Sequence, residues 1–289
     1  MTVEWKGEDW FFEKTPFDKG ISLGVKVGRR ILERKSPFQT IEVYDTELLG
    51  RMLVLDGVIQ LTEFDEFGYH EMFAHVPMCA HPDPRSVLVV GGGDGGVLRE
   101  LAKYKCLEEI HLCEIDAEVI EVSKQFLPVT AVGFEDPRMK VFVEDGAEFL
   151  KACRNKYDLI LVDSSDPIGP AEVLFRLPFF ESVKNALKPN GVAVTQCETI
   201  YLFLPLVEEV VASARELFPK VQYANVIMPT YPSGMIGLLV CSLGPHHSQP
   251  TREIPKEIQE GLRYYSPAVH RAAFTLPRFA ARVLSRENS

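Results

Sequence analysis

The sequence predicts an α/β protein with a mostly parallel, doubly wound sheet, preceded by a small antiparallel β region. From residue 86 onward, apolar runs alternate five times with helical segments. This alternation is typical of parallel strands joined by right-handed crossovers. Before residue 62, shorter runs alternate apolar residues with polar residues or glycine, as expected for strands with one exposed face.

The N-terminal region, residues 1–62, is expected to form a β-strand domain of its own. Its alternating runs cover residues 20–27, 39–44 and 51–55. The dipeptide Asp56-Gly57 follows the last run and predicts a hairpin turn before Val58. Residues 63–289 are expected to form the larger α/β domain.

In the larger domain we expect each strand to be followed by a helix. The first apolar runs are bounded by glycine, proline or acidic residues. Two further strands follow one another without a helix, which predicts an antiparallel hairpin at one edge. The expected strands are 86–90, 109–114, 139–143, 157–163, 192–196, 221–227 and 236–241; the expected helices are 97–104, 118–126, 147–153, 178–187 and 202–217, then a polar loop at 244–250 and a helical tail at 264–284.

Composition excludes several classes of protein. The chain has 289 residues, of which 46% are hydrophobic and 25% are charged, so it is neither disordered nor fibrous. Its 31 basic and 41 acidic residues give a net charge of −10, which disfavours nucleic acid and anionic membranes as partners. A cationic ligand is compatible with this charge.

The cysteines and the chain's opening predict a reduced, cytoplasmic, soluble protein. None of the six cysteines forms a Cys-x-x-Cys pair, so a zinc site is not expected. Residues 1–9 are polar and acidic, unlike a secretory signal. The sequence contains no apolar run of the roughly 18 residues that a membrane helix needs.

The first strand of the larger domain ends in a glycine-rich turn. Gly91, Gly93 and Gly96 fit a dinucleotide-binding fingerprint between a strand and a helix. Asp94 lies within the same turn, where its carboxylate would repel a pyrophosphate by roughly a few kcal/mol. The turn therefore favours a cationic ligand, although Asp94 could also be a helix N-cap.

Acidic residues also follow the next three strands. Glu114 lies where an acid binds ribose hydroxyls in nucleoside-binding sheets. Asp145 could accept a hydrogen bond from an adenine amine or cap a helix, and a capping role suits Asp116 better than Glu114. Asp163 ends an apolar strand three residues before Asp166, whose Asp-Pro sequence could also be a plain turn.

Ligands bind beyond the carboxyl ends of parallel strands, so these acids should meet in one place. No basic residue is expected to offset them there. The sequence therefore predicts a pocket that binds a polycation carrying an adenosine.

The same segments resemble the spermidine synthase family of aminopropyltransferases. The likeness lies in residues 55–60, 65–72, 91–100, 163–172 and 229–234, and in the C-terminal tail from Tyr265 to Phe279 with His270. These segments occur in the family's order over nearly the whole chain. The resemblance implies a methyltransferase-like (Rossmann-like) doubly wound sheet with a small N-terminal antiparallel β domain, in homodimers or homotetramers.

The resemblance also implies the reaction: an aminopropyl group passes from decarboxylated S-adenosylmethionine, a co-substrate, to putrescine, giving spermidine and 5′-methylthioadenosine. No metal and no resident cofactor are implied. Asp163 resembles the general base, with Tyr69 beside it, and Asp94 the residue that holds the donor's amine. The other positions that it marks are Gln39, Gln60, Gly91, Gly93, Glu114, Asp145, Gly146 and Pro170 for the donor, and His70, Asp94, Asp163, Asp166 and Tyr231 for the amine.

Other functions remain open at this point. An S-adenosylmethionine methyltransferase shares the predicted sheet, but Asp94 would oppose that donor's carboxylate. A related aminopropyltransferase could use agmatine or cadaverine, which differ from putrescine by few atoms. A nicotinamide dehydrogenase is disfavoured, because no phosphate-binding cation accompanies the glycine loop of this sequence. A non-catalytic binding subunit would be expected to have lost Asp163 or Tyr69, and both are present.

Overall fold

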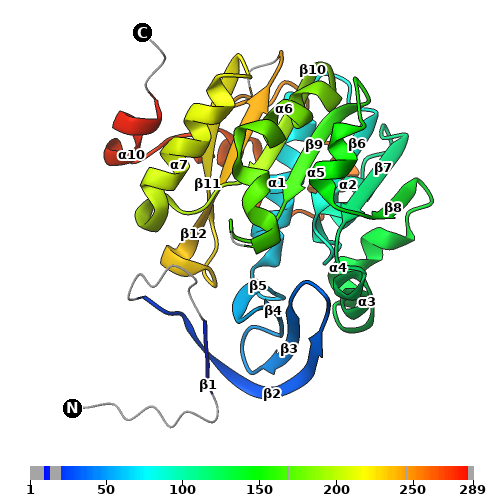
Figure 1. Ribbon diagram of the computed structural model, residues 1–289, viewed down its shortest axis with the longest axis vertical. Helices are drawn as coiled ribbons and strands as arrows, with labels where there is room; N and C mark the ends of the chain where they lie inside the picture. The colour runs from blue at the N-terminus through cyan, green and yellow to red at the C-terminus, as the bar shows by residue number, and fades with distance from the viewer. Residues whose placement is uncertain (1–9, 14–20, 168, 245–246, 286–289) are drawn as a thin grey trace.

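The computed structural model describes residues 10–13, 21–167, 169–244 and 247–285, and these form two sheets (Figure 1). The N-terminal sheet is antiparallel, with its five strands in chain order. Asp56 and Gly57 both have positive φ angles (49° and 84°), as the predicted hairpin turn requires. The strands are β1 (Trp10–Phe12), β2 (Gly24–Lys35), β3 (Thr40–Thr46), β4 (Arg51–Leu55) and β5 (Val58–Thr62).

The larger sheet has seven strands in the order β11-β12-β10-β9-β6-β7-β8. The pairs from β10 to β8 are parallel, whereas β12 pairs antiparallel with both β10 and β11. The predicted antiparallel pair is therefore confirmed, with β11 at the edge. The strands are β6 (Ser86–Gly91), β7 (Glu109–Glu114), β8 (Met139–Val143), β9 (Tyr157–Asp163), β10 (Leu187–Gln196), β11 (Lys220–Ile227) and β12 (Met235–Ser242).

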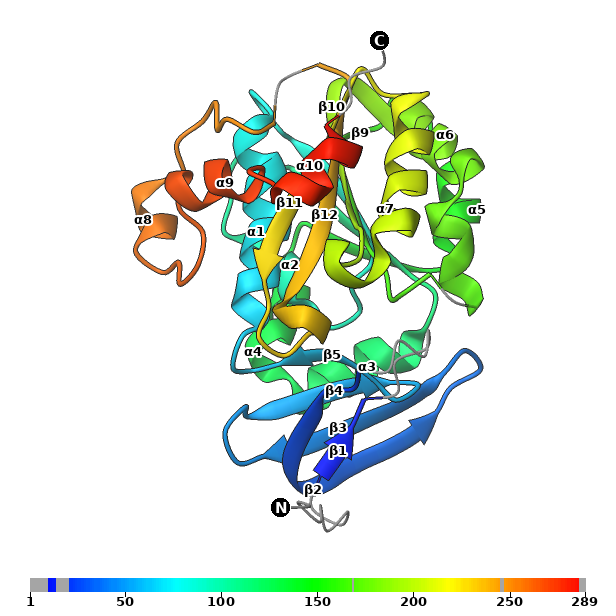
Figure 2. The same cartoon turned by 90° about the vertical axis from the view of Figure 1, so that its left-hand side faces the viewer.

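Helices cover both faces of this sheet (Figure 2). Val87 and Val89 of β6 pack in one core with α1 and α2, and Leu88 and Val90 pack in a second core with α5, α6 and α7. The helices are α1 (Glu66–Ala80), α2 (Gly96–Ala102), α3 (Ala117–Phe126), α4 (Pro128–Ala131), α5 (Gly146–Lys151), α6 (Leu177–Ala186), α7 (Ile200–Arg215), α8 (Lys256–Gln259), α9 (Pro267–Ala273) and α10 (Arg278–Leu284), with 3₁₀ turns η1 (Val132–Glu135), η2 (Gly169–Phe175) and η3 (Pro232–Gly234).

Helix α1 was not predicted as an element. All but one of its fifteen residues are buried, so it has no apolar stripe of helical period against a polar face. It also contains a proline, Pro77, and proline normally ends a helix. Four of its buried residues are polar, whereas a buried helix is expected to be mostly apolar. These polar residues, Glu66, His70, Glu71 and His75, have partners inside the protein.

Several predicted boundaries are wrong at the N-terminus. The run expected at 20–27 is a strand that begins at Gly24 and continues through a charged, largely exposed stretch to Lys35. Strand β1 was not predicted, because three residues give no readable alternation. Elsewhere most of the element ends differ by one or two residues, and β10 starts five residues early at Leu187. Residues 245–246 of the expected polar loop lie outside the described part.

Helix α3 joins the two sheets. Val119 and Val122 pack with Ile41, Val43 and Leu53 of the N-terminal sheet in one apolar cluster. The N-terminal sheet therefore closes over the carboxyl ends of the parallel strands (Figure 1). The division of the chain at residue 62 stays a prediction.

No helix in the described ranges is both long and apolar enough to cross a lipid bilayer.

Candidate active site

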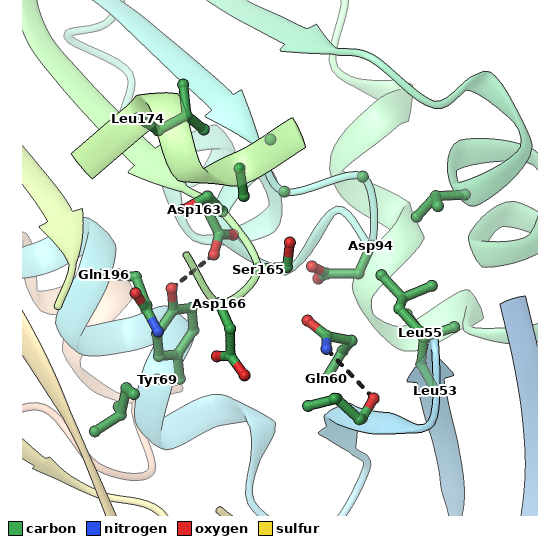
Figure 3. Close-up of a pocket in the computed structure, with 18 of the residues that line it drawn as sticks. Leu53, Leu55, Gln60, Tyr69, Asp94, Asp163, Ser165, Asp166, Leu174 and Gln196 are labelled. Atoms are coloured by element: carbon green, nitrogen blue, oxygen red, sulfur yellow. Dashed lines mark hydrogen bonds between the residues drawn. The ribbon is translucent and has the colours of Figure 1, made fainter. Parts of the chain in front are cut away.

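A pocket of about 240 Å³ lies between the two sheets. The N-terminal sheet contributes Leu55 and Gln60, and the larger domain contributes the loops that follow its parallel strands. Figure 3 shows Asp94, Asp163 and Asp166 at this pocket, with Gln60 entering from the opposite side. The acidic strand ends are therefore brought together as predicted.

The pocket forms at the switch point of the sheet, where β6 and β9 are neighbours and their loops diverge. Gly91 is paired with Asp163 in the parallel register. Gly91 and Gly92 have φ angles of +76° and +72°, and a Cβ on Gly91 would lie 2.1 Å from the Asp163 carbonyl oxygen. A side chain at either position would be strained, so the glycines allow the Asp163 carboxylate to sit against the loop.

The Asp163 carboxyl has one hydrogen-bonded oxygen and one unpaired oxygen in the described part of the chain. The Tyr69 hydroxyl donates a hydrogen bond to its Oδ1 at 2.6 Å. Its other oxygen, Oδ2, is buried and has no hydrogen-bond partner among the described residues. Burial and the nearby Asp94 raise the pKa of Asp163 to about 7. Such a carboxyl can take up a proton near neutral pH.

Asp94 is not isolated, which corrects the expectation that no basic residue offsets the acids. His70 of α1 places Nε2 3.2 Å from Asp94 Oδ1, and the Gly96 N–H donates to the same oxygen at 2.7 Å. Burial alone would raise the pKa of Asp94, but the imidazolium of His70 outweighs it and lowers that pKa. Gly95, with a φ of 84°, occupies the N-cap position of α2 instead of Asp94.

Glu114 and Asp145 line the pocket at the ends of β7 and β8. Glu114 is buried, and Oε1 accepts from the Asp116 N–H at 2.9 Å. Burial raises the pKa of Glu114 to about 7. Asp116 caps α3, as predicted, and also accepts from Gln39 Nε2 at 2.9 Å. Asp145 caps α5 through Oδ1, which confirms the predicted capping role, and it also lines the pocket.

A second cluster of acidic side chains in the pocket consists of Asp166, Glu198 and Glu13. Burial raises the pKa of Asp166, and the pKa of the buried Glu198 is raised by burial and by Asp166. Burial, together with the nearby Asp166, also raises the pKa of Glu13 to about 7. Glu13 and Glu198 were missed by the sequence reasoning. The spacing of Glu198 after β10 repeats the pattern of an acid beyond a strand end and could have identified it.

The remaining predicted residues are placed as follows. The Tyr231 hydroxyl donates to the Gln60 carbonyl oxygen, which links η3 to strand β5. The Tyr231 ring lies 6.3 Å from that of Tyr69, measured between centroids. Pro170 belongs to η2, but its side chain lies outside the described part. The predicted residues that line the pocket are Gln39, Gln60, Tyr69, His70, Gly91, Gly93, Asp94, Glu114, Asp145, Gly146, Asp163, Asp166 and Tyr231.

The charge of the pocket selects the kind of ligand. Eight acidic side chains line it, whereas in the described part of the chain no lysine or arginine does and His70 is its only basic group. The buried Oε1 of Gln196 also lacks a partner among the described residues. Unpaired buried oxygens require donors, and ammonium groups supply them with the complementary charge.

Comparison with known proteins gives matches over nearly the whole chain. Residues 66–249 match the model of the spermine/spermidine synthase domain, and residues 9–63 match that of the spermidine synthase tetramerisation domain. Spermidine synthase of Dictyostelium discoideum is 46% identical over 276 residues, 96% of this chain and 97% of that protein. Spermidine synthase of Coffea arabica is 49% identical over 285 residues, 95% of this chain and 90% of that one.

Solved structures match equally well. A crystal structure of a spermidine synthase in complex with the transition-state analogue AdoDATO superposes with a TM-score of 0.90 at 36% identity. It covers 99% of this chain and 98% of its own. Spermidine synthase from Thermotoga maritima gives a TM-score of 0.87, also at 36% identity, over 96% and 94% of the two chains. These matches confirm the doubly wound fold and the family resemblance.

Proposed function

This chain belongs to the spermidine synthase family, and we propose that it transfers the aminopropyl group of decarboxylated S-adenosylmethionine to putrescine. The observation that supports this most directly is the Asp163 carboxyl, with one buried oxygen unpartnered in a pocket lined by eight acids. Such a pocket suits two cationic substrates and one proton acceptor.

The reaction is a direct displacement at carbon. A neutral amine nitrogen attacks the propyl methylene bound to the sulfonium, so a C–N bond forms and the C–S bond breaks. The electron pair of the broken bond goes to sulfur, which leaves as the neutral thioether of methylthioadenosine. The protein's contribution is to align the two substrates and to supply the amine without its proton.

Asp163 is the proposed general base. An alkylammonium with a pKa of about 10.4 is almost wholly protonated at pH 7, so the proton must be removed in the site. Asp163 Oδ2 takes that proton, while Tyr69 holds Oδ1 at 2.6 Å and fixes the carboxylate plane. Burial and Asp163 raise the pKa of Tyr69, so its hydroxyl stays a donor throughout.

Donor binding is proposed for the glycine loop and the neighbouring strand ends. Glu114 accepts from the ribose hydroxyls, and the free oxygen of Asp145 accepts from the adenine amine. Asp94 accepts from the donor's ammonium through Oδ2, because its Oδ1 already has two partners. The other proposed donor contacts are Gln39, Gln60, Gly91, Gly93, Gly146 and Pro170.

The acidic group at Asp166 is proposed to hold the second ammonium of putrescine. Asp166 raises the pKa values of both Glu13 and Glu198, and all three side chains line the pocket, so the Asp166 carboxylate lies near both of the others. A diamine spanning from this group to Asp163 presents one nitrogen for reaction and anchors the other. Tyr231 and His70 complete the amine side of the pocket.

A product assay tests the function. The purified protein is supplied with decarboxylated S-adenosylmethionine and an equimolar mixture of putrescine, cadaverine and agmatine, and the products are measured by mass spectrometry. We expect spermidine as the main product, with one methylthioadenosine per transfer. Aminopropylated cadaverine or agmatine as the main product would overturn the assigned acceptor. Methylated products from S-adenosylmethionine would overturn the reaction type.

The raised pKa of Asp163 predicts the pH dependence. At pH 6 a carboxyl with a pKa of about 7 is mostly protonated and cannot accept a proton. As pH rises to 8 it becomes ionised, so the rate at low amine concentration should rise about tenfold. The measurement is initial rate against pH, with chemistry shown to be rate-limiting by pre-steady-state kinetics. A flat profile would contradict this role of Asp163.

We also infer self-assembly into a homodimer or homotetramer and a cytoplasmic location. The match of residues 9–63 to a tetramerisation domain supports the assembly, and light scattering of the purified protein would distinguish the two forms. All six cysteines are free thiols, as is usual in a reducing compartment.

A further inference from the structure

Behind Asp94, a chain of buried charges leads away from the pocket. Arg99 of α2 makes two hydrogen bonds to Glu66, at 2.9 Å to Oε1 and 2.8 Å to Oε2. Glu66 Oε2 lies 2.6 Å from His70 Nδ1, one helical turn further along α1. His70 Nε2 then reaches Asp94 Oδ1 at 3.2 Å. Glu66 and Arg99 do not line the pocket.

The geometry favours a His70 that carries two protons. Each ring nitrogen faces a carboxylate oxygen, and a neutral imidazole has only one N–H to donate. Only the imidazolium donates to both. The side chains of His70 and Glu66 are each 3% exposed, so water does not replace either contact. Burial alone would lower the pKa of His70, but Asp94 and Glu66 outweigh it and raise that pKa to about 10.

The glycine loop is shaped around this ring. A Cβ on Gly96 would lie 2.2 Å from His70 Cε1, so the loop's last glycine makes room for the imidazole. The Gly96 N–H also donates to Asp94 Oδ1. The contacts from His70 Nε2 and from the Gly96 N–H therefore both reach Oδ1 of Asp94, so Oδ2 of Asp94 remains available to a ligand.

We propose that Glu66 and Arg99 are positioning residues: through His70, they fix the Asp94 carboxylate and determine at which pH Asp163 becomes a base. This inference rests on the proposed function and extends it to two residues outside the pocket.

The charged groups around His70 support this coupling. Glu66 and Tyr69 face it from α1, Asp94 from the glycine loop, and Asp163 from the end of β9. The His70 charge opposes the effect of Asp94 and lowers the pKa of Asp163. If Glu66 is neutralised, the buried imidazole loses one anion and its pKa falls toward neutral. The Asp163 pKa should then rise.

The test compares Glu66→Gln with a matched control, Glu100→Gln. Glu100 is an equally buried carboxylate on the neighbouring helix and also binds a histidine and Arg99, with His75 Nε2 at 3.0 Å and Arg99 Nε at 2.9 Å. It does not line the pocket. Loss of either buried charge should lower stability, but only Glu66→Gln should change the pH profile.

For Glu66→Gln we expect the midpoint of the ascending rate–pH limb to move upward by about half to one pH unit. Turnover should then fall about 3- to 8-fold at pH 6.5 and less than about 2-fold at pH 9. Glu100→Gln should keep the wild-type midpoint. If Glu66→Gln does not fold, His70→Gln, which keeps a donor but loses the charge, should raise the midpoint similarly. An unchanged midpoint, or an equal loss at every pH, would overturn the proposal.

A measurement without turnover separates this inference from the proposed function. Nitrogen NMR of the ¹⁵N-histidine-labelled protein, with His70 assigned from His70→Gln, should show an imidazolium up to pH 8.5. In Glu66→Gln the same signal should titrate between pH 6 and 8. A neutral His70 at pH 7.5 in the unmodified protein would refute the inference even if spermidine is formed. Absence of turnover with His70 charged would refute only the proposed function.

Discussion

Asp163→Asn is expected to lower kcat by about 10²–10⁴-fold, the range found when a general base is removed. The amide still accepts the Tyr69 hydrogen bond on its oxygen, so the local geometry should be preserved. It cannot accept the proton that the attacking ammonium must lose. Turnover is measured with both substrates saturating, and donor binding is measured by calorimetry.

Asp166→Asn is a useful comparison, because Asp166 lies three residues after Asp163, in the loop that follows β9, and its carboxyl also has a raised pKa. If Asp166 anchors the distant ammonium, its loss should raise the KM for putrescine and change kcat far less than the loss of Asp163. Asp163 is not the base if Asp163→Asn keeps more than about a tenth of the original kcat while it still binds the donor.

The parallel part of the fold and its acidic strand ends were predictable from local sequence. Buried strands such as Tyr157–Asp163 contain continuous apolar runs, here residues 159–162, and the residue that follows each run lies at the carboxyl edge of the sheet. The position of Asp163 in the pocket follows from these two facts. Its partner Tyr69 could be named only from the family resemblance, because α1 was not recognised as a helix.

The rest of the site depends on contacts that local pattern does not encode. Glu13 follows a three-residue strand and reaches the pocket only because the N-terminal sheet folds over the larger one. Glu198 lies just beyond the end of β10, so its spacing could have identified it, but its unusual φ of 42° could not be predicted from the sequence pattern. The charge of His70 depends on Asp94, 24 positions away, and on Glu66 in an unrecognised helix.

Asp94→Asn is expected to weaken binding of decarboxylated S-adenosylmethionine and to reduce discrimination against S-adenosylmethionine. The two donors differ by one carboxylate. In the unmodified protein that group would meet Asp94 beside Asp163, and close like charges interact by roughly 4 kcal/mol at an effective dielectric near 20. Screening and rearrangement reduce this value, so we expect about 10²-fold tighter binding of the decarboxylated donor.

The structure adds a second effect of the same substitution. Loss of the Asp94 charge lowers the pKa of His70, but wherever His70 is still protonated its Nε2 no longer faces an anion and should attract the extra carboxylate of S-adenosylmethionine, most strongly at low pH. The ratio of the two dissociation constants should therefore fall by at least about tenfold in Asp94→Asn. Methylthioadenosine, which lacks both the ammonium and the carboxylate, is the control ligand, and its affinity should hardly change. Equal affinities for the two donors in the unmodified protein, or an unchanged ratio in the variant, would exclude Asp94 as the selecting residue and return the methyltransferase reaction to consideration.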